Sequence, residues 1–150
     1  MLKKLFAPGS DSLLTSVGLL ILRLWLGLTM LLNHGASKLK GFSDMADKFP
    51  DPLGVGHHAS LGLAIFAEVV ASLLLIMGLA TRFAALVLSI NMAVAFFVVH
   101  KGGLSGEHSG ELAFIYLAGY TTLLLAGAGR ISVDQSLFSA KAKPAKDRSA

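Results

Sequence analysis

Four long apolar runs divide the chain of 150 residues. A helix that crosses a bilayer needs about 20 predominantly apolar residues, and a surface helix of a soluble protein would show a polar stripe with a 3.6-residue period. These runs have no such stripe and contain only isolated polar residues. They therefore predict four membrane-spanning helices, at residues 13–33, 60–80, 83–100 and 111–128.

The connections between the runs predict their arrangement. The segment Gly-Leu-Ala-Thr-Arg at residues 78–82 is so short that the second and third spans must form an antiparallel hairpin. In the longer connection, residues 34–59, we expect a short interfacial helix. Ser43 would be its N-cap, and Pro50 and Pro52 would end it.

The fold class that follows is all-α: a membrane-embedded antiparallel four-helix bundle over residues 13–130. Residues 1–12 form an N-terminal segment. The first apolar run is too long for the core of a signal peptide and lacks a small-residue cleavage site, so we expect it to be retained as a span. Residues 131–150 are basic, and the stretch from residue 139 is low in complexity, which predicts a disordered tail.

Composition supports the membrane interpretation and narrows the chemistry. Charged residues make up 15% of the chain, against about 25% in soluble proteins. The absence of cysteine excludes disulfides, thiolate metal sites and a dithiol relay carried by this chain. The net charge of +4 does not indicate nucleic acid, because the basic residues are not interleaved with aromatic residues. The lipid bilayer is the expected partner.

Lysine and arginine residues predict the orientation of the bundle. Eight of them lie on the side that holds the N-terminus, the hairpin turn and the tail. The opposite side has four, namely Lys38, Lys40, Lys48 and Lys101. The positive-inside rule then places both termini in the cytoplasm.

Two charged residues, Arg23 and Glu68, fall deep inside the apolar runs, where ionisable groups are costly and usually face a bundle interior or a cavity. Arg23 and Glu68 lie at overlapping depths in the first and second runs, so we expect them to form an ion pair. This pair is either the floor of a ligand site or a structural pair that only sets helix register. Asn91, in the third run, is more typical of a hydrogen bond between helices than of a ligand contact.

All five histidines fall on the predicted outer side: His34, His57, His58, His100 and His108. In one interpretation they are loop residues that never meet. In a second, His34, His100 and Glu111 accept the protons that quinol oxidation releases. A metal site is less favoured, because no H-x-x-x-H or H-E-x-x-H motif occurs. Haem between His34 and His100 is the least favoured. A quinone is thus the candidate cofactor, and no metal ligand is assigned.

Residues 32–42, LNHGASKLKGF, mark the outer end of the first span. We expect Gly35 to end the helix there and Lys38 and Lys40 to reach the lipid headgroups. His34 would then lie at the mouth of a polar face that runs down to Arg23.

Three longer segments carry a family resemblance: LRLWLGLTMLLNHGASKLKGF (22–42), AEVVASLLLIMGLATRFAALVLSINMAVA (67–95) and ELAFIYLAGYTTLLLAGAGRISVD (111–134). In this order and spacing they resemble the DoxX family of small four-helix membrane proteins. The matching features are Arg23, the step formed by His34, Gly35 and Lys38, Glu68, the 78–82 hairpin, and the GAGRISVD segment.

The resemblance implies a multi-pass protein of the bacterial inner membrane. It also implies quinone-linked redox chemistry, since related proteins are described as membrane subunits of thiosulfate:quinone oxidoreductase. The bundle of this family is likened to those of membrane quinone reductases that use a cysteine pair. This chain has no cysteine, so its electrons would come from a partner or pass directly through a bound cofactor.

We therefore expect an integral membrane subunit that binds a quinone-like or lipid-like ligand within the bundle. It would serve a quinone-linked oxidoreductase system, together with a protein partner or a second copy of the chain. The candidate ligand and proton-handling residues are Arg23, His34, Lys38, Glu68, Asn91, His100 and Glu111. Two alternatives stay open: a non-enzymatic scaffold or assembly partner, and, less favoured, a small-solute transporter.

Overall fold

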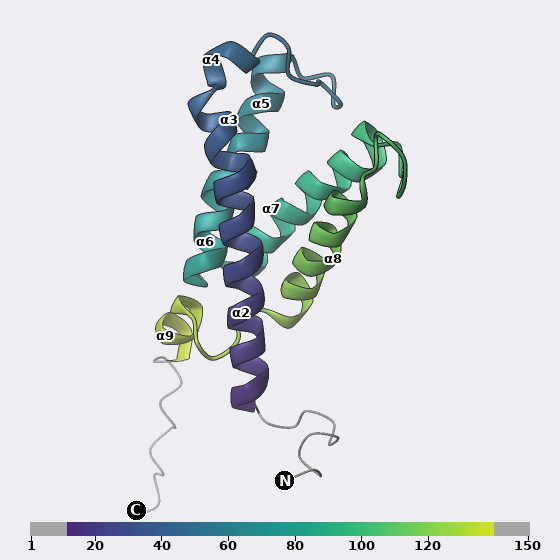
Figure 1. The fold of residues 1–150 in the computed structure, drawn as a ribbon. Helices are drawn as coiled ribbons and strands as arrows, with labels where there is room; N and C mark the ends of the chain where they lie inside the picture. Colours follow the sequence, from purple (N-terminus) through teal and green to yellow (C-terminus); the bar gives the residue numbers. More distant parts are fainter. Residues whose placement is uncertain (1–11, 140–150) are drawn as a thin grey trace, which may run out of the picture.

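The computed structural model describes residues 12–139, and every regular element in this part of the chain is helical (Figure 1). The first helix runs without a break from Ser12 to Lys40. It consists of α2 (Ser12–Met30), the π-helical segment η1 (Leu31–Gly35) and α3 (Ala36–Lys40). A short helix, α4 (Phe42–Met45), follows after Gly41.

The second and third helices form the predicted hairpin. The second is continuous through α5 (His57–Ile65), η2 (Phe66–Ala71) and α6 (Ser72–Met77). The third is continuous through α7 (Thr81–Ala93) and η3 (Val94–Val99). The turn between them has left-handed backbone angles at Gly78 and at Ala80, with φ of 69° and 47°. Glycine adopts this conformation without steric cost, which explains its place at the end of α6.

Three of these helices are long and apolar enough to cross a membrane: Leu13–Lys40, His57–Met77 and Thr81–Val99. The fourth, α8 (Glu111–Ala126), has 16 residues. At 1.5 Å per residue it is about 24 Å long, shorter than a hydrocarbon core of about 30 Å. It begins at Glu111, as the apolar run predicts, and its last residue is Ala126, two residues before the predicted end. Gly127 follows with a φ of 82°.

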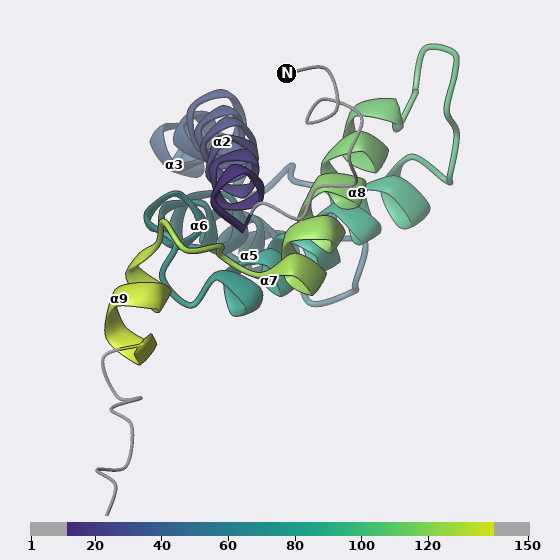
Figure 2. The same ribbon diagram turned by 90° about the horizontal axis from the view of Figure 1, so that it is seen from below.

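The helices pack in a ring in which α2 contacts α6, α6 contacts α7, α7 contacts α8, and α8 returns to α2. Figure 2, which looks along the bundle, shows α8 beside α7 and α6 beside α2. In Figure 1 the far ends of α7 and α8 lean away from the first helix. The core between the helices consists of Met30, Ala71, Leu75, Ala84, Ala85, Leu88, Met92, Tyr116, Tyr120 and Leu123. Its alanines allow the helices to approach closely.

The first helix ends within residues 32–42 but at Lys40, so the prediction that Gly35 ends it is wrong. The backbone at Gly35 is helical, with φ −63° and ψ −46°. Gly35 is buried against the second helix, and the helix continues to Lys40. The short helix expected in the long connection is present as α4, but Ser43 lies inside it and Gly41 occupies the N-cap position.

Part of the segment predicted to be a disordered tail is ordered. Residues Val133–Ser139 form α9, which lies near the beginning of α2 (Figure 1). Asp134 N donates to Gly78 O at 2.9 Å, and Arg130 N donates to Ser16 Oγ at 3.1 Å. The tail prediction is therefore wrong for residues 133–139. Its remainder, 140–150, and residues 1–11 of the N-terminal segment lie outside the described residues.

Candidate functional site

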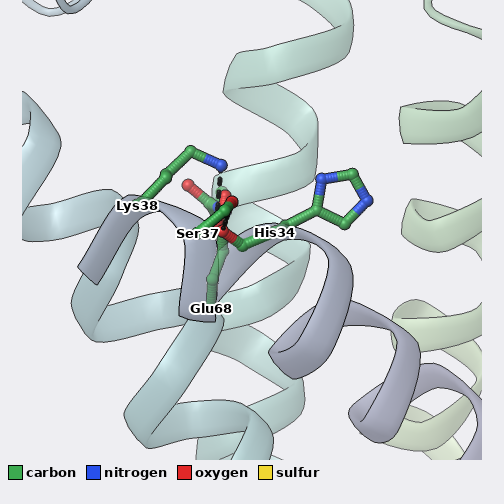
Figure 3. Close-up of polar contacts among 5 residues, drawn as sticks. His34, Ser37, Lys38 and Glu68 are labelled. Atoms are coloured by element: carbon green, nitrogen blue, oxygen red, sulfur yellow. Dashed lines mark hydrogen bonds and ion pairs between the residues drawn. The ribbon is translucent and has the colours of Figure 1, made fainter. Parts of the chain in front are cut away.

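Three polar side chains from three different helices meet between the first, second and third helices. Lys38 Nζ lies 2.7 Å from Glu68 Oε2, and Asn91 Nδ2 donates to Glu68 Oε1 at 3.4 Å. Figure 3 shows Lys38, on α3, reaching over to Glu68 on the neighbouring helix. The side chains are 18% exposed at Lys38 and 6% at Glu68. The carboxylate is thus buried with a cation on one oxygen and an amide on the other.

Gly35 explains how Lys38 reaches Glu68. A Cβ at position 35 would lie 2.7 Å from the Glu68 backbone oxygen, so any larger residue would force the first and second helices apart. Lys38 follows three residues later and therefore lies on the same helix face. The close approach at the glycine brings its ammonium within hydrogen-bonding distance of the Glu68 carboxylate.

All three π-helical segments of the described chain adjoin this cluster. η2 carries Glu68 itself, η1 contains Gly35, and η3 follows the helix that carries Asn91. Segments of π-helix are rare and occur frequently at functional sites, because the additional residue in the turn changes which side chains face inward. Because the three segments lie in three neighbouring helices around Lys38, Glu68 and Asn91, they support the choice of this cluster as the candidate site.

A cavity of about 430 Å³ opens beside the cluster, between the second helix, the third helix and the loop before α5. Lys38, Glu68 and Asn91 contribute polar groups to its wall, and apolar side chains form most of the remainder. The apolar residues around it include Phe49, Leu53, Leu63, Phe66, Ile90 and Val99. An apolar cavity with a few converging polar groups is the usual form of a small-molecule site.

The loop that covers one side of the cavity is held by Asp51. Its carboxylate accepts hydrogen bonds from Ser60 Oγ at 2.7 Å, from Gly56 N at 2.8 Å and from Val55 N at 3.0 Å. The bond from the Ser60 hydroxyl, followed by those from the backbone, lowers the pKa of Asp51. A second tie joins His57 Nδ1 to Phe49 O at 2.6 Å. These bonds fix Phe49 and Leu53 over the cavity.

His34 lies close to the cluster in sequence, but its imidazole points away from Lys38 and Glu68 toward α8 (Figure 3). Its ring makes an edge contact with Tyr116 at a centroid distance of 6.0 Å. Tyr116 stacks on Tyr120 at 5.8 Å, and the Tyr120 hydroxyl donates to Leu26 O at 3.2 Å. His34 therefore belongs to an aromatic row between the first and fourth helices.

The other candidates on the predicted outer side do not join His34. His100 Nδ1 lies 3.1 Å from His108 O, within the loop that follows η3. Glu111 is exposed at the beginning of α8, where its N–H bonds Ser109 Oγ. His34, His100 and Glu111 thus have different contacts, and their shared role in accepting protons stays a prediction. Within residues 12–139, no group of three or more histidine or acidic side chains could hold a metal ion.

Arg23 lies away from this site, near the end of α6. Its side chain is fully buried, and its guanidinium donates to Leu75 O and to Ile131 O. A Cβ at Gly78 would overlap the guanidinium. The predicted Arg23–Glu68 ion pair is wrong, because Arg23 bonds backbone carbonyls at this end of the bundle while Glu68 bonds Lys38.

Of the seven candidate residues, the structure thus brings together Lys38, Glu68 and Asn91. The ammonium is a hydrogen-bond donor, the carboxylate is an acceptor and a proton acceptor, and the amide offers both functions. Sequence reasoning missed the cavity and its covering loop. One signal could have indicated the loop: Asp51, between two prolines, precedes a Gly-Val-Gly turn and the helix that begins at His57.

Comparisons with known proteins agree with this architecture. The family model for DoxX matches residues 18–101, which include Lys38, Glu68 and Asn91. An uncharacterized protein of Haemophilus influenzae is 34% identical over 118 residues, covering 73% of this chain and 83% of that relative. A second uncharacterized protein of the same organism is 32% identical over 130 residues, covering 80% and 83%. No solved structure matches the chain. The protein belongs to the DoxX family of membrane proteins.

Proposed function

We propose that this protein binds a quinone-like or lipid-like amphiphile in the cavity beside Lys38 and Glu68. The observation that carries the proposal is the pairing of an apolar space of about 430 Å³ with one polar wall that holds a cation, an anion and an amide. The polar headgroup would bond this wall. The hydrocarbon chain would lie against Leu63 and Ile90, which are exposed on the membrane-facing surface and also line the cavity.

A quinone or quinol ring fits the chemistry of the three side chains. Lys38 and Asn91 can donate hydrogen bonds to a quinone carbonyl, and Glu68 can accept one from a quinol hydroxyl. Oxidation of a quinol to a quinone releases two protons and two electrons. Glu68 lies where it can accept a proton, and the electrons would pass to an oxidoreductase partner because this chain has no cysteine. On this proposal the protein serves as the quinone-binding subunit of that system.

The proposal also includes a multi-pass orientation in the bacterial inner membrane with both termini in the cytoplasm. The beginning of α2, the hairpin turn and α9 lie together at one end of the bundle (Figure 1). Arg82 and Arg130 are exposed at this end. The positive-inside rule would then place the end that holds α9 in the cytoplasm.

Equilibrium binding of a short-chain quinone to the protein in lipid nanodiscs tests the proposal. Replacing Glu68 by Gln removes a charge-assisted hydrogen bond and the counter-charge of Lys38, so binding should weaken about 10- to 100-fold. Glu111→Gln is the matched control, because this carboxylate is exposed and lies outside the cavity. Absence of quinone binding by the wild type, or equal weakening by both variants, would refute the proposal.

The scaffold alternative makes a different prediction for the same pair. If Lys38 and Glu68 only specify packing, replacing both by Leu should leave stability equal or higher, since apolar residues often replace buried ion pairs without loss. Cells that carry the double variant should also behave like cells that carry the wild-type protein. Under the ligand proposal the double variant folds but loses quinone binding.

A further inference from the structure

The charge of the cavity wall restricts which headgroups can enter. Lys38 and Glu68 are the charged residues among those that line the cavity in the described chain. They form an ion pair at 2.7 Å, so their formal charges cancel. The wall is therefore polar at one end but has no net charge.

A charged headgroup would disturb this balance. An anion beside Lys38 would also lie close to the Glu68 carboxylate, and a cation beside Glu68 would lie close to the Lys38 ammonium. In a largely apolar cavity such a third charge is left without its own counter-charge, and its lost hydration is not replaced. A neutral headgroup escapes this cost, because it can bond the amide of Asn91 and the remaining acceptor capacity of Glu68.

We infer that the cavity selects neutral amphiphiles and rejects both anionic and cationic ones of equal chain length. This inference rests on the proposed ligand site and narrows its ligand class. It excludes ionised fatty acids, anionic phospholipids and long-chain amines, while uncharged alcohols, quinones and quinols remain. The Lys38–Glu68 pair sets the selectivity. Removing either partner should therefore change the preference from neutral to charged amphiphiles and should not abolish binding.

Photoreactive alkyl probes can measure this selectivity directly. Three ten-carbon probes with a diazirine in the chain would carry a hydroxyl, a sulfonate or a trimethylammonium headgroup. The sulfonate and the trimethylammonium stay charged at all working pH values, so protonation does not confuse the comparison. The protein is labelled in nanodiscs of uncharged phosphatidylcholine, and mass spectrometry maps the sites. Labelling at Met92 and Val94, which line the cavity, is divided by labelling at Ile115, which is exposed on α8.

For the wild type we expect cavity labelling by the alcohol to exceed that by either charged probe about tenfold or more, since burying a charge without a counter-charge is strongly unfavourable. Glu68→Gln leaves Lys38 unpaired and should make the sulfonate the preferred probe. Lys38→Met leaves Glu68 unpaired and should favour the trimethylammonium probe. Lys40→Met is the matched control, because Lys40 is exposed on the same helix and outside the cavity, and its profile should equal that of the wild type.

The exchange of charges, Lys38→Glu with Glu68→Lys, restores a neutral pair and should restore the preference for the alcohol. It also keeps the test decisive if a single variant does not fold. Equal cavity labelling of the wild type by all three probes would overturn the selectivity inference while leaving the ligand proposal standing. Absence of cavity labelling by every probe would overturn both.

Discussion

Each end of the bundle holds a cation, but only Lys38 lines a cavity: the hollow of about 590 Å³ at the end that holds α9 is lined by Thr81, Arg82 and Asp134 among others, and not by Arg23. At the end that holds α9, Arg23 is enclosed and donates to two backbone carbonyls. At the other end, Lys38 pairs with Glu68 on the wall of a cavity of about 430 Å³. A charge inside a membrane bundle is therefore not by itself the mark of a site. Lys38 differs from Arg23 in lining a cavity, which is why the proposed ligand site is placed beside Lys38.

The enclosed end depends on Arg23 as a tie between distant segments. Its guanidinium connects the first helix to the end of the second and to the segment before α9. Asp134 strengthens the same junction, because its carboxylate accepts from Ala80 N at 2.7 Å and from Thr81 N at 2.9 Å. The acidic residue also suits the positive N-terminal end of α7. This junction assembles the GLATR and GAGRISVD segments into one structural unit.

The largest expected effect comes from Gly78→Ala at the enclosed end. The new methyl group would overlap the Arg23 guanidinium, and the left-handed backbone at position 78 adds strain. Left-handed strain of about 1–2 kcal/mol and overpacking of about 1–3 kcal/mol together predict a loss of roughly 3 kcal/mol of unfolding free energy. Denaturant unfolding in detergent measures it.

Gly62→Ala is the control for that experiment, since an added Cβ there meets no described atom within 4 Å. We expect it to leave stability unchanged or slightly raised. If Gly78→Ala were as stable as Gly62→Ala, the junction around Arg23 would not be the rigid tie described above.

An intermediate effect, on binding rather than stability, is expected from Val94→Trp at the open end. Val94 lines the cavity, so the indole ring of the introduced tryptophan would occupy the space proposed for the ligand. Quinone binding should weaken about tenfold or more, which is about 1.4 kcal/mol. The unfolding free energy should change by less than about 1 kcal/mol, because the ring fills existing space.

Val98→Trp provides the matched comparison, because Val98 lies in the same π-helical segment but is exposed and outside the cavity. Its quinone affinity should equal that of the wild type in a titration on nanodiscs. Equal loss of binding in both variants would place the ligand somewhere other than the cavity.

The smallest effect concerns the pH dependence of the covering loop. The pKa of Asp51 is lowered in the folded protein, chiefly by the hydrogen bond from Ser60. A lowered folded-state pKa means that the carboxylate stabilises the fold above its ordinary pKa of about 3.9. This contribution is lost as the pH falls through the folded value. The melting temperature of Asp51→Asn should therefore lie slightly below that of the wild type at neutral pH.

The two melting curves should converge as the pH falls below about 4 and through the lowered folded-state pKa of Asp51, where the wild-type carboxylate takes up its proton. Ser43→Ala, which changes an exposed side chain outside this hydrogen-bonded loop, serves as the reference. A difference between Asp51→Asn and the wild type that does not vary with pH would show that the charge of Asp51 has no part in holding the loop.

Much of the fold followed from the sequence because apolar length is a local property. The four helices overlap the predicted runs and the hairpin turn lies at 78–82, although the first helix continues to Lys40; a short helix is present in the long connection, but as Phe42–Met45. The candidate residues Lys38, Glu68 and Asn91 were also identified from their positions in or beside apolar runs. Their partners were not, because helix depth alone does not specify which faces meet.

The error in the course of the first helix has an identifiable origin. The prediction for the first helix extends a regular 3.6-residue period from Arg23 to His34 and ends the helix at Gly35. The structure inserts the π-helical segment η1 at this place, which changes the angular relation of the residues after it. His34 consequently turns toward Tyr116, whereas Lys38 turns toward Glu68.

The sequence by itself indicated a membrane protein, its helices and its family, because the length of apolar runs and short motifs are properties of neighbouring residues. Only the tertiary structure decided which charges pair, since that depends on helix rotation, on the three π-helical segments and on the close approach at Gly35. The stretch LNHGASKLKGF looks like a helix end in the sequence. In the folded protein it is the place where two helices meet closely enough for Lys38 to pair with Glu68 on the wall of a cavity.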